Sequence, residues 1–356
     1  MLFRWLAAAV VFVGAVIGGI IVAGGSLADY DAALNAFALI TVVSVLLGFV
    51  AYGLIEYLQT GAVASISRQF DTRTVALIPV AIAINIILGQ AVAAALKVPI
   101  YMDSIGTILV GALAGPVPGI ITGLSSNLLW TYVLPAPFHS DFAAPFAIVA
   151  AAIGLLAGIA GRAGFLRSRP NRGVGELALS GVVALLVVGG LALYTYTRFY
   201  EKTFTFFNPD PASDPGLLLV VMGWAVAILI VGAVVGFLAL LFGRRDTAVA
   251  WVVVAGAVTG LIAGLSSAPI AANLFGGVTG AGTDFLVLFF RQQGSDVLTS
   301  SFQQSLISDP IDKVTTFLIV FVILSAMARR TKARFPQGER LIDAEPDPPD
   351  IQGAPA

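Results

Sequence analysis

The chain has 356 residues, of which 58% are hydrophobic and only 11% are charged, and its formal net charge is −1. Soluble domains carry about 25% charged residues, so this composition excludes an ordinary soluble protein and predicts an all-α integral membrane protein in contact with the lipid bilayer. The absence of cysteine excludes disulfides and thiolate metal sites. The near-zero net charge does not indicate a nucleic-acid partner, and we expect none.

Ten apolar segments follow one another along the chain. A complete membrane span needs roughly 20 apolar residues, and most of the segments reach or approach this length. We therefore predict about ten transmembrane helices, at 3–25, 33–57, 74–96, 102–115, 117–134, 142–161, 176–196, 216–242, 248–270 and 311–328.

The distribution of basic residues predicts the orientation. With a cytoplasmic N-terminus, 14 of the 19 basic residues fall on the cytoplasmic side, and Lys97, Arg198, Lys202, Arg291 and Lys313 remain outside. Positive charges concentrate on the cytoplasmic side of membrane proteins. We therefore expect a multi-pass protein of the cell (plasma) membrane with both termini in the cytoplasm. The first segment reads as an uncleaved anchor or, alternatively, as a secretory signal.

Asp103 stands at the head of a short apolar run that ends at Gly115-Pro116. A carboxylate in hydrocarbon costs a few kcal/mol, so it normally faces a cavity or a partner. Alternatively, Asp103 lies at the outer interface and caps the following helix. The two interpretations are compatible, since a capping residue can also face an outward-opening cavity.

The outer segment 271–308 contains the glycine-rich stretch GGVTGAG (276–282), followed by Asp284 and the apolar run 285–290. That run is too short to cross a bilayer, so we expect a re-entrant or surface helix in this loop. Glycine turns allow backbone amides to approach a ligand, although the segment also reads as a flexible linker. The stretch SDPIDK (308–313) reads as a helix start capped by Asp309, with a structural role.

These observations define one candidate site. We expect five polar side chains to converge on an outward-facing substrate site: Asp103, Thr107, Asn127, Thr283 and Asp284. His139 is the only histidine, and it lacks partners for a metal site, so we expect no metal and no other cofactor. There is no P-loop and no recognisable nucleophile motif, so we expect no enzymatic activity and no catalytic residue.

The stretch MDSIGTILVGALAGPVPGIITGLSSNLLW (102–130) resembles the second and third helices of the S components of energy-coupling factor (ECF) transporters. A short helix, a Gly-Pro turn and a Gly-rich helix ending in a polar residue recur in that family. PFAIVAAAIGLLAGIAGRAG (145–164) resembles the fourth helix. The distal APIAANLFGGVTGAGTD and SLISDPIDKVTTFLIVFVIL resemble an S-component-like subgroup of unassigned substrate.

The resemblance implies an S-component-like core of six helices, interrupted by an insertion. It places core helices 1–4 in 74–172, and core helices 5 and 6 with the Gly-rich outer loop in 247–328. Residues 1–60 become an N-terminal two-helix extension, and 173–246 an inserted transmembrane hairpin with an outer loop. The polar, Pro-rich segment 329–356 is expected to be a disordered cytoplasmic tail.

The resemblance further implies a substrate-capture subunit for a vitamin or related micronutrient. It would work with separate ECF ATPase and transmembrane coupling subunits, because the chain has no nucleotide-binding motif of its own. Two alternatives stay open. One is an autonomous ion-coupled secondary transporter that uses its buried carboxylates. The other is the membrane sensory module of a signalling system whose output domain lies on a separate protein.

Overall fold

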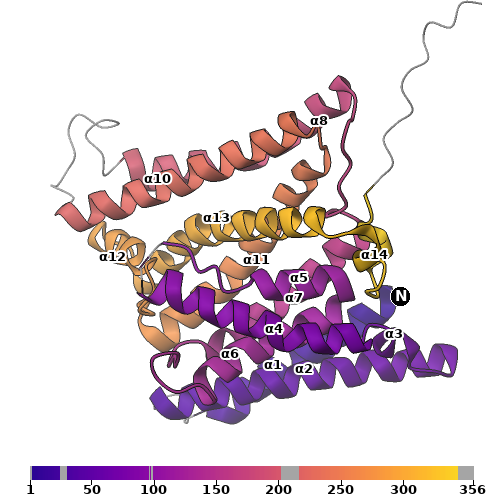
Figure 1. Ribbon diagram of the computed structural model, residues 1–356. Helices are drawn as coiled ribbons and strands as arrows, with labels where there is room; N and C mark the ends of the chain where they lie inside the picture. Colours follow the sequence, from indigo (N-terminus) through magenta and orange to yellow (C-terminus); the bar gives the residue numbers. More distant parts are fainter. Residues whose placement is uncertain (1, 25–29, 96, 98, 202–215, 344–356) are drawn as a thin grey trace, which may run out of the picture.

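The computed structural model describes residues 2–24, 30–95, 97, 99–201 and 216–343, and all regular structure within them is helical (Figure 1). This confirms the predicted all-helical class. The long helices are α1 (Leu2–Ala23), α2 (Tyr30–Thr60), α4 (Thr72–Gly89), α6 (Pro116–Tyr132), α7 (Ala147–Ala163), α8 (Val174–Thr195), α10 (Gly216–Leu238), α11 (Ala248–Phe275) and α13 (Val297–Ala326). The shorter helices include α3 (Ala64–Ser67), α5 (Ile105–Ala114), α12 (Asp284–Gln292) and α14 (Arg329–Lys332).

Among the described helices, seven are long and apolar enough to cross a membrane. They correspond to α1, α2, α4, α7, α8, α10 and α11, so membrane insertion rests on these helices, and the exact count of ten spans stays a prediction. The helix α5 has only ten residues and is roughly 15 Å long, about half of a bilayer's hydrocarbon core. The helix α13 is long enough, but three charged residues interrupt its apolar sequence: Asp309, Asp312 and Lys313.

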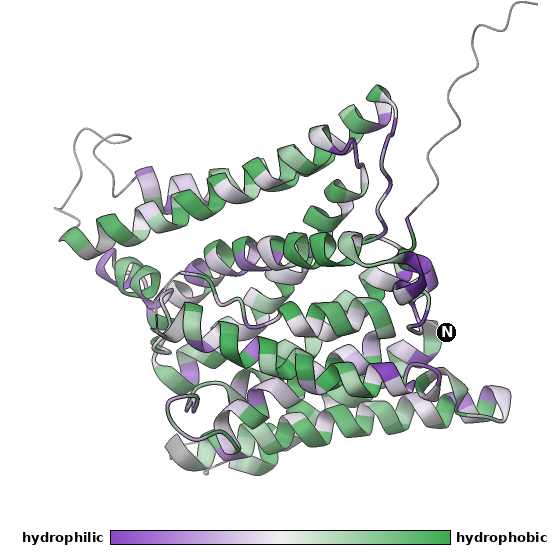
Figure 2. Cartoon of the chain, viewed as in Figure 1, coloured by the Kyte–Doolittle hydropathy of each residue, from purple (hydrophilic) through white to green (hydrophobic). Residues whose placement is uncertain are grey.

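The helices run side by side in layers (Figure 1). The pair α8 and α10 lies on one flank and the pair α1 and α2 on the other, with α11, α13, α5 and α7 between them. Figure 2 shows hydrophobic residues along the helix lengths and hydrophilic residues gathered near their ends. The loops around 165–172 and 244–246 and the segment 329–343 meet at one end, which we call the arginine-rich end.

Glycine brings α6 and α7 into contact. A Cβ atom on Gly154 of α7 would lie 2.2 Å from the carbonyl carbon and oxygen of Gly119 in α6, and one on Gly158 would lie 2.3 Å from the nitrogen of Pro116. Only glycine fits such positions. Small residues spaced four apart are the usual means of close helix packing in membranes.

A second glycine stripe joins α11 to α13. Cβ atoms on Gly256 and Gly260 would lie 2.7 Å and 2.5 Å from the Cα atoms of Val314 and Pro310, and one on Gly264 would lie 3.1 Å from the Asp309 carboxylate. The spacing GxxxGxxxG in α11 therefore determines which part of α13 it contacts. It places the charged residues of α13 directly against α11.

The start of α13 differs from the sequence expectation. The helix begins at Val297 and continues through Pro310, and its N-cap is Asp296, whose carboxylate accepts the backbone N–H of Thr299 at 3.0 Å. Asp309 is therefore not a cap. It lies roughly 20 Å along the helix axis from the N-cap, near the middle of a 30-residue helix. Lys313, which was counted as an outer-loop residue, is likewise buried inside the bundle.

The expected disorder of the C-terminal tail is wrong for residues 329–343. The backbone N–H of Gln337 donates to the Leu113 carbonyl at 2.9 Å, and the Arg340 guanidinium donates to the Arg162 carbonyl at 2.7 Å. Leu341 is buried in the main core, and Lys332 pairs with Asp343 at 2.7 Å. A buried leucine and these paired polar groups hold the segment against α5 and α7. Residues 344–356 lie outside the described residues.

Candidate functional site

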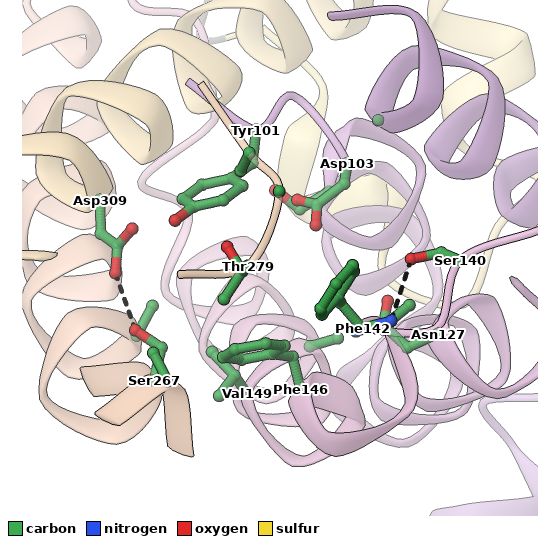
Figure 3. A pocket seen from close by; sticks show the side chains of 18 of the residues that line it. Tyr101, Asp103, Asn127, Ser140, Phe142, Phe146, Val149, Ser267, Thr279 and Asp309 are labelled. Carbon is green, nitrogen blue, oxygen red and sulfur yellow. Dashed lines mark hydrogen bonds between the residues drawn. The ribbon is translucent and has the colours of Figure 1, made fainter. Parts of the chain in front are cut away.

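A cavity of about 320 Å³ opens at the end of the bundle away from the arginine-rich end. Its walls come from α4, α6 and α7 on one side and from α11 and α13 on the other, and the glycine-rich loop 276–283 lies at its mouth. Figure 3 labels several of the side chains that line it, among them Tyr101, Asp103, Asn127, Phe142, Phe146, Ser267 and Asp309. The lining also includes Trp130, Asp284, Gln304 and Lys313.

The floor of the cavity contains a buried ion cluster around Lys313. The Lys313 ammonium lies 2.5 Å from the Asp312 carboxylate and 3.5 Å from that of Asp103, and it donates to the Ser104 hydroxyl at 2.8 Å. The side chains of Lys313 and Asp312 are 4% and 0% exposed. Buried charges are costly unless they are paired and hydrogen-bonded, and in this cluster the single ammonium contacts both carboxylates.

Asp312 also holds the chain that leads into α5. Its Oδ1 accepts the backbone N–H groups of Tyr101 at 3.2 Å and Met102 at 2.9 Å. The segment 99–104 is not helical, yet it descends between the helices as far as the start of α5. Irregular backbone at membrane depth requires such partners, or a water-filled cavity, for its polar groups. The short α5 therefore begins deep in the bundle, with Asp103 and Ser104 at the cavity floor.

Asp309 lies one helical turn before Lys313 and is 4% exposed. Its carboxylate accepts a hydrogen bond from the Ser267 hydroxyl of α11 at 3.1 Å and a longer one from Ser308 at 3.4 Å. Within the described residues it forms no ion pair. Figure 3 shows Asp309 and Ser267 on one side of the cavity, with Asp103 and Phe142 on the other.

Aromatic side chains form the opposite wall. The rings of Phe142 and Phe146 pack on Phe275 of α11, with centroid separations of 5.3 Å and 5.8 Å. Trp130, near the end of α6, is 8% exposed, and its indole N–H has no hydrogen-bond partner among the described residues. A buried indole N–H normally finds an acceptor. The wall therefore combines apolar surface with one unused donor.

The glycine-rich loop is organised by Asp284 at the start of α12. The carboxylate accepts the backbone N–H groups of Thr279 and Gly280, the latter at 2.7 Å, and the Thr279 hydroxyl at 3.2 Å. Partial burial raises the pKa of Asp284, and these hydrogen bonds oppose the shift. The Lys97 ammonium donates to the Gly280 carbonyl. The hydrogen bonds to Asp284 and from Lys97 thus fix the conformation of the loop.

The rim carries the only histidine. The imidazole Nε2 of His139 lies 2.8 Å from the Asp141 carboxylate, and this contact raises the pKa of His139 above its usual value. Nearby, the Gln90 amide donates to the Pro137 carbonyl at 2.8 Å, which ties α4 to the same loop. The rim is therefore solvated and polar.

Of the five residues predicted for the site, the structure brings three to the cavity wall: Asp103, Asn127 and Asp284. Thr107 is 1% exposed and accepts from the Asn85 amide at 2.8 Å, within the contact between α4 and α5. Thr283 is also 1% exposed and shares a hydrogen bond with the Tyr101 hydroxyl at 2.9 Å. Neither threonine lines the cavity. Thr283 supports Tyr101, which lines the cavity, whereas Thr107 is bonded to Asn85 behind the wall.

Asp309 and Lys313 line the cavity, although the stretch SDPIDK is typical of a helix start. The available signal was the GxxxGxxxG stripe of α11, which requires a closely packed partner helix. Three further residues line the cavity without a signal in the sequence, where they are ordinary aromatics near helix ends: Tyr101, Trp130 and Phe142.

Among the described residues, no group of three or more histidines or carboxylates is placed to hold a metal ion. Comparison of the chain with protein-family models, with curated proteins and with solved structures found no match. Fold and cavity define a helical membrane protein with a deep polar and aromatic cavity open at one end. The geometry of the cavity is therefore the basis for proposing what it binds.

Proposed function

We propose that this protein is the substrate-capture subunit of an ECF-type importer for a vitamin or related micronutrient. It resides in the cell membrane with both termini in the cytoplasm, and it acts with separate ATPase and coupling subunits. The observation that carries the proposal is the cavity of about 320 Å³, lined by aromatic rings and by buried charged groups. Small-molecule sites are concave, mostly apolar and about 300–1,000 Å³, with a few placed polar groups.

The location of the cavity supports capture from outside. It opens away from the arginine-rich end, and basic residues mark the cytoplasmic side of membrane proteins. Its floor is closed by α5, the Lys313 cluster and the core that α5 forms with α7, α11 and α13. A ligand entering from the mouth would therefore stop midway through the bundle, where coupling subunits would be needed to complete transport.

The test is to purify the protein, extract it and identify any bound small molecule by mass spectrometry. Ala271→Phe places a ring inside the cavity, and Ala178→Phe places the same ring on the exposed face of α8 as a matched control. We expect a co-purified molecule in the wild type and in Ala178→Phe, and its loss in Ala271→Phe. Equal amounts in all three proteins would show that the cavity is not the binding site.

One observation favours a second candidate, an ion-coupled secondary transporter. Asp309 is a buried carboxylate in the middle of α13 without an ion pair among the described residues, and such groups mark ion pathways in transporters. Reconstituted alone, a capture subunit should bind its ligand without accumulating it. Uptake into liposomes containing only this chain, driven by a proton or sodium gradient, would decide for the transporter.

A further inference from the structure

The charged groups around the cavity are unbalanced. Four aspartates and two lysines line it, and a fifth aspartate, Asp312, lies directly behind Lys313. Both lysines are occupied. Lys313 is bound to Asp312, Asp103 and Ser104, and Lys97 donates to the Gly280 carbonyl. The cavity therefore has an excess of negative charge, its buried cation Lys313 is already paired, and its other basic groups, Lys97 and His139, are exposed at the mouth.

From this imbalance we infer that the cavity takes an organic cation, an amine with an apolar or aromatic body, whose charged nitrogen is held by Asp309. The inference rests on the proposed function, in that it names the chemical class of the captured molecule.

Asp309 is the carboxylate best suited to the cation. Asp103 already shares Lys313, at 3.5 Å. Asp284 is satisfied by the backbone of its own loop, and Asp141 lies beside His139 on the solvated rim. Asp309 alone is almost fully buried with only hydroxyl donors at hydrogen-bond distance, and the Lys313 ammonium one turn away is bound to Asp312, Asp103 and Ser104. A carboxylate in such a place is costly unless a counter-charge reaches it, and a ligand amine entering the cavity supplies one.

The surroundings of Asp309 also fit an ammonium group. Ser267, Ser305 and Gln304 lie beside it on the cavity wall and offer oxygen acceptors for the remaining N–H groups of an amine. These residues come from α11 and α13, which the glycine stripe holds at close range, so the acceptor set is rigid. Preorganised acceptors lose little entropy when the ligand binds.

The aromatic wall supplies the rest of the site. Phe142 and Phe146 face the cavity across from Asp309, in the view of Figure 3, and their packing on Phe275 fixes their rings. Aromatic faces attract both flat apolar groups and cations. The expected molecule is therefore cationic at one end, with an apolar or aromatic body.

The test uses three probes with the same indole body and different charge at neutral pH: tryptamine (positive), tryptophol (neutral) and indole-3-propionate (negative). Thermal stabilisation and calorimetric titration of the purified full-length protein measure their binding. We expect tryptamine to bind at least tenfold more tightly than either of the others. Asp309→Asn should remove this preference, with a fall of about 10- to 100-fold in tryptamine affinity, while Asp296→Asn at the helix cap should leave it unchanged.

The comparison of the three probes on the wild-type protein tests the inference even if Asp309→Asn fails to fold. Equal binding of the three probes, tighter binding of the anion, or binding of none would overturn the inference. The failure of the proposed function is separate, because it is read from the molecule extracted from the cavity. An anionic or neutral molecule that is lost in Ala271→Phe would leave capture intact and refute only the choice of a cation.

Discussion

Asp312 in α13 accepts the backbone N–H of Met102, 210 residues earlier in the chain, at 2.9 Å. Met102 has a φ of 56°, in the left-handed region, and it belongs to the non-helical segment that descends to the start of α5. The carboxylate thus accepts the backbone hydrogen bonds that carbonyl groups would accept in a helix, and the Lys313 ammonium compensates its charge. This contact joins the two halves of the bundle at the cavity floor.

Removing the cation from this cluster should destabilise the fold. Lys313→Met leaves Asp312 as an uncompensated buried carboxylate beside the half-buried Asp103, which we expect to cost about 3–5 kcal/mol. Adding Asp103→Asn removes one of these charges and should recover part of the loss. Thermal unfolding in detergent measures both variants, with Arg73→Met as a partly exposed control expected to change stability by about 0.5 kcal/mol or less. A normal melting temperature for Lys313→Met would contradict the role assigned to the cluster.

The close packing of α6 and α7 gives a second prediction. Gly154→Ala places a methyl group against the backbone of Gly119 and should cost about 1–3 kcal/mol, because backbone cannot move aside cheaply. The matched control is Gly189→Ala in α8, where a Cβ atom meets no other atom within 4 Å. We expect the control to melt at the wild-type temperature or slightly above it. The same readout for both variants would mean that the two helices are less tightly packed than described.

Substitutions of Thr107 and Asn127 should differ in their effects, the first on stability alone and the second on ligand affinity. Thr107→Val removes an acceptor from the Asn85 amide, a type of contact worth about 0.6 kcal/mol in membrane proteins, and should leave affinity for the co-purified molecule unchanged. Asn127→Ala changes the cavity wall and should weaken affinity. Titration of the extracted molecule into each ligand-free variant measures the difference. A large loss of affinity in Thr107→Val at normal stability would restore Thr107 to the binding site.

The orientation can be measured directly, since the chain contains no native cysteine. A membrane-impermeant maleimide applied to intact cells should label Asp141→Cys on the cavity rim and should not label Arg330→Cys at the arginine-rich end. Both positions should react after the cells are broken. Labelling of Arg330→Cys in intact cells would reverse the assignment of the cavity mouth to the outside.

His139 offers a pH prediction at the rim. Its contact with Asp141 raises the pKa, so an NMR titration of this single histidine should give a value above about 6.5, and Asp141→Asn should lower it. Because the folded-state pKa is raised, the stabilising contribution of the pair is fully present below the unfolded pKa. It is lost as pH rises through the folded-state pKa. An unchanged titration in Asp141→Asn would show that the pair does not persist in solution.

The helical class and most helix positions were accessible from the sequence, because long apolar runs have few other solutions in a membrane. The predicted start at 311 for the last helix failed for a definable reason. Pro310 and the flanking aspartates are typical of a helix N-terminus. Here they continue a helix whose first half, 297–308, carries serines and glutamines packed against α11 and α12. The polar composition of 297–308 indicated a loop, whereas in the structure this segment is a helix with buried serines and glutamine.

The residues of the candidate site could be predicted from the sequence only in part, for a related reason. Asp103 and Asp284 can be found because charges in an apolar sequence stand out, but the sequence does not show where the side chains of Thr107 and Thr283 point. Which face of a helix points into a cavity depends on the partner helix. For α13 that partner is α11, whose glycine stripe aligns Asp309 with Ser267. This pairing of distant segments could not be obtained from local patterns.

The hydrogen bond from Gln337 to the Leu113 carbonyl has a consequence for biosynthesis. Chains are made from the N-terminus, so α5 and α7 enter the membrane long before residues 329–343 exist. Until then the carbonyl of Leu113 lacks this donor, and the part of the core that Leu341 joins stays uncovered. Completion of the arginine-rich end therefore follows the insertion of α5 and α7. A nascent chain stopped anywhere before residue 337 would display that unfinished surface to the quality-control machinery of the cell.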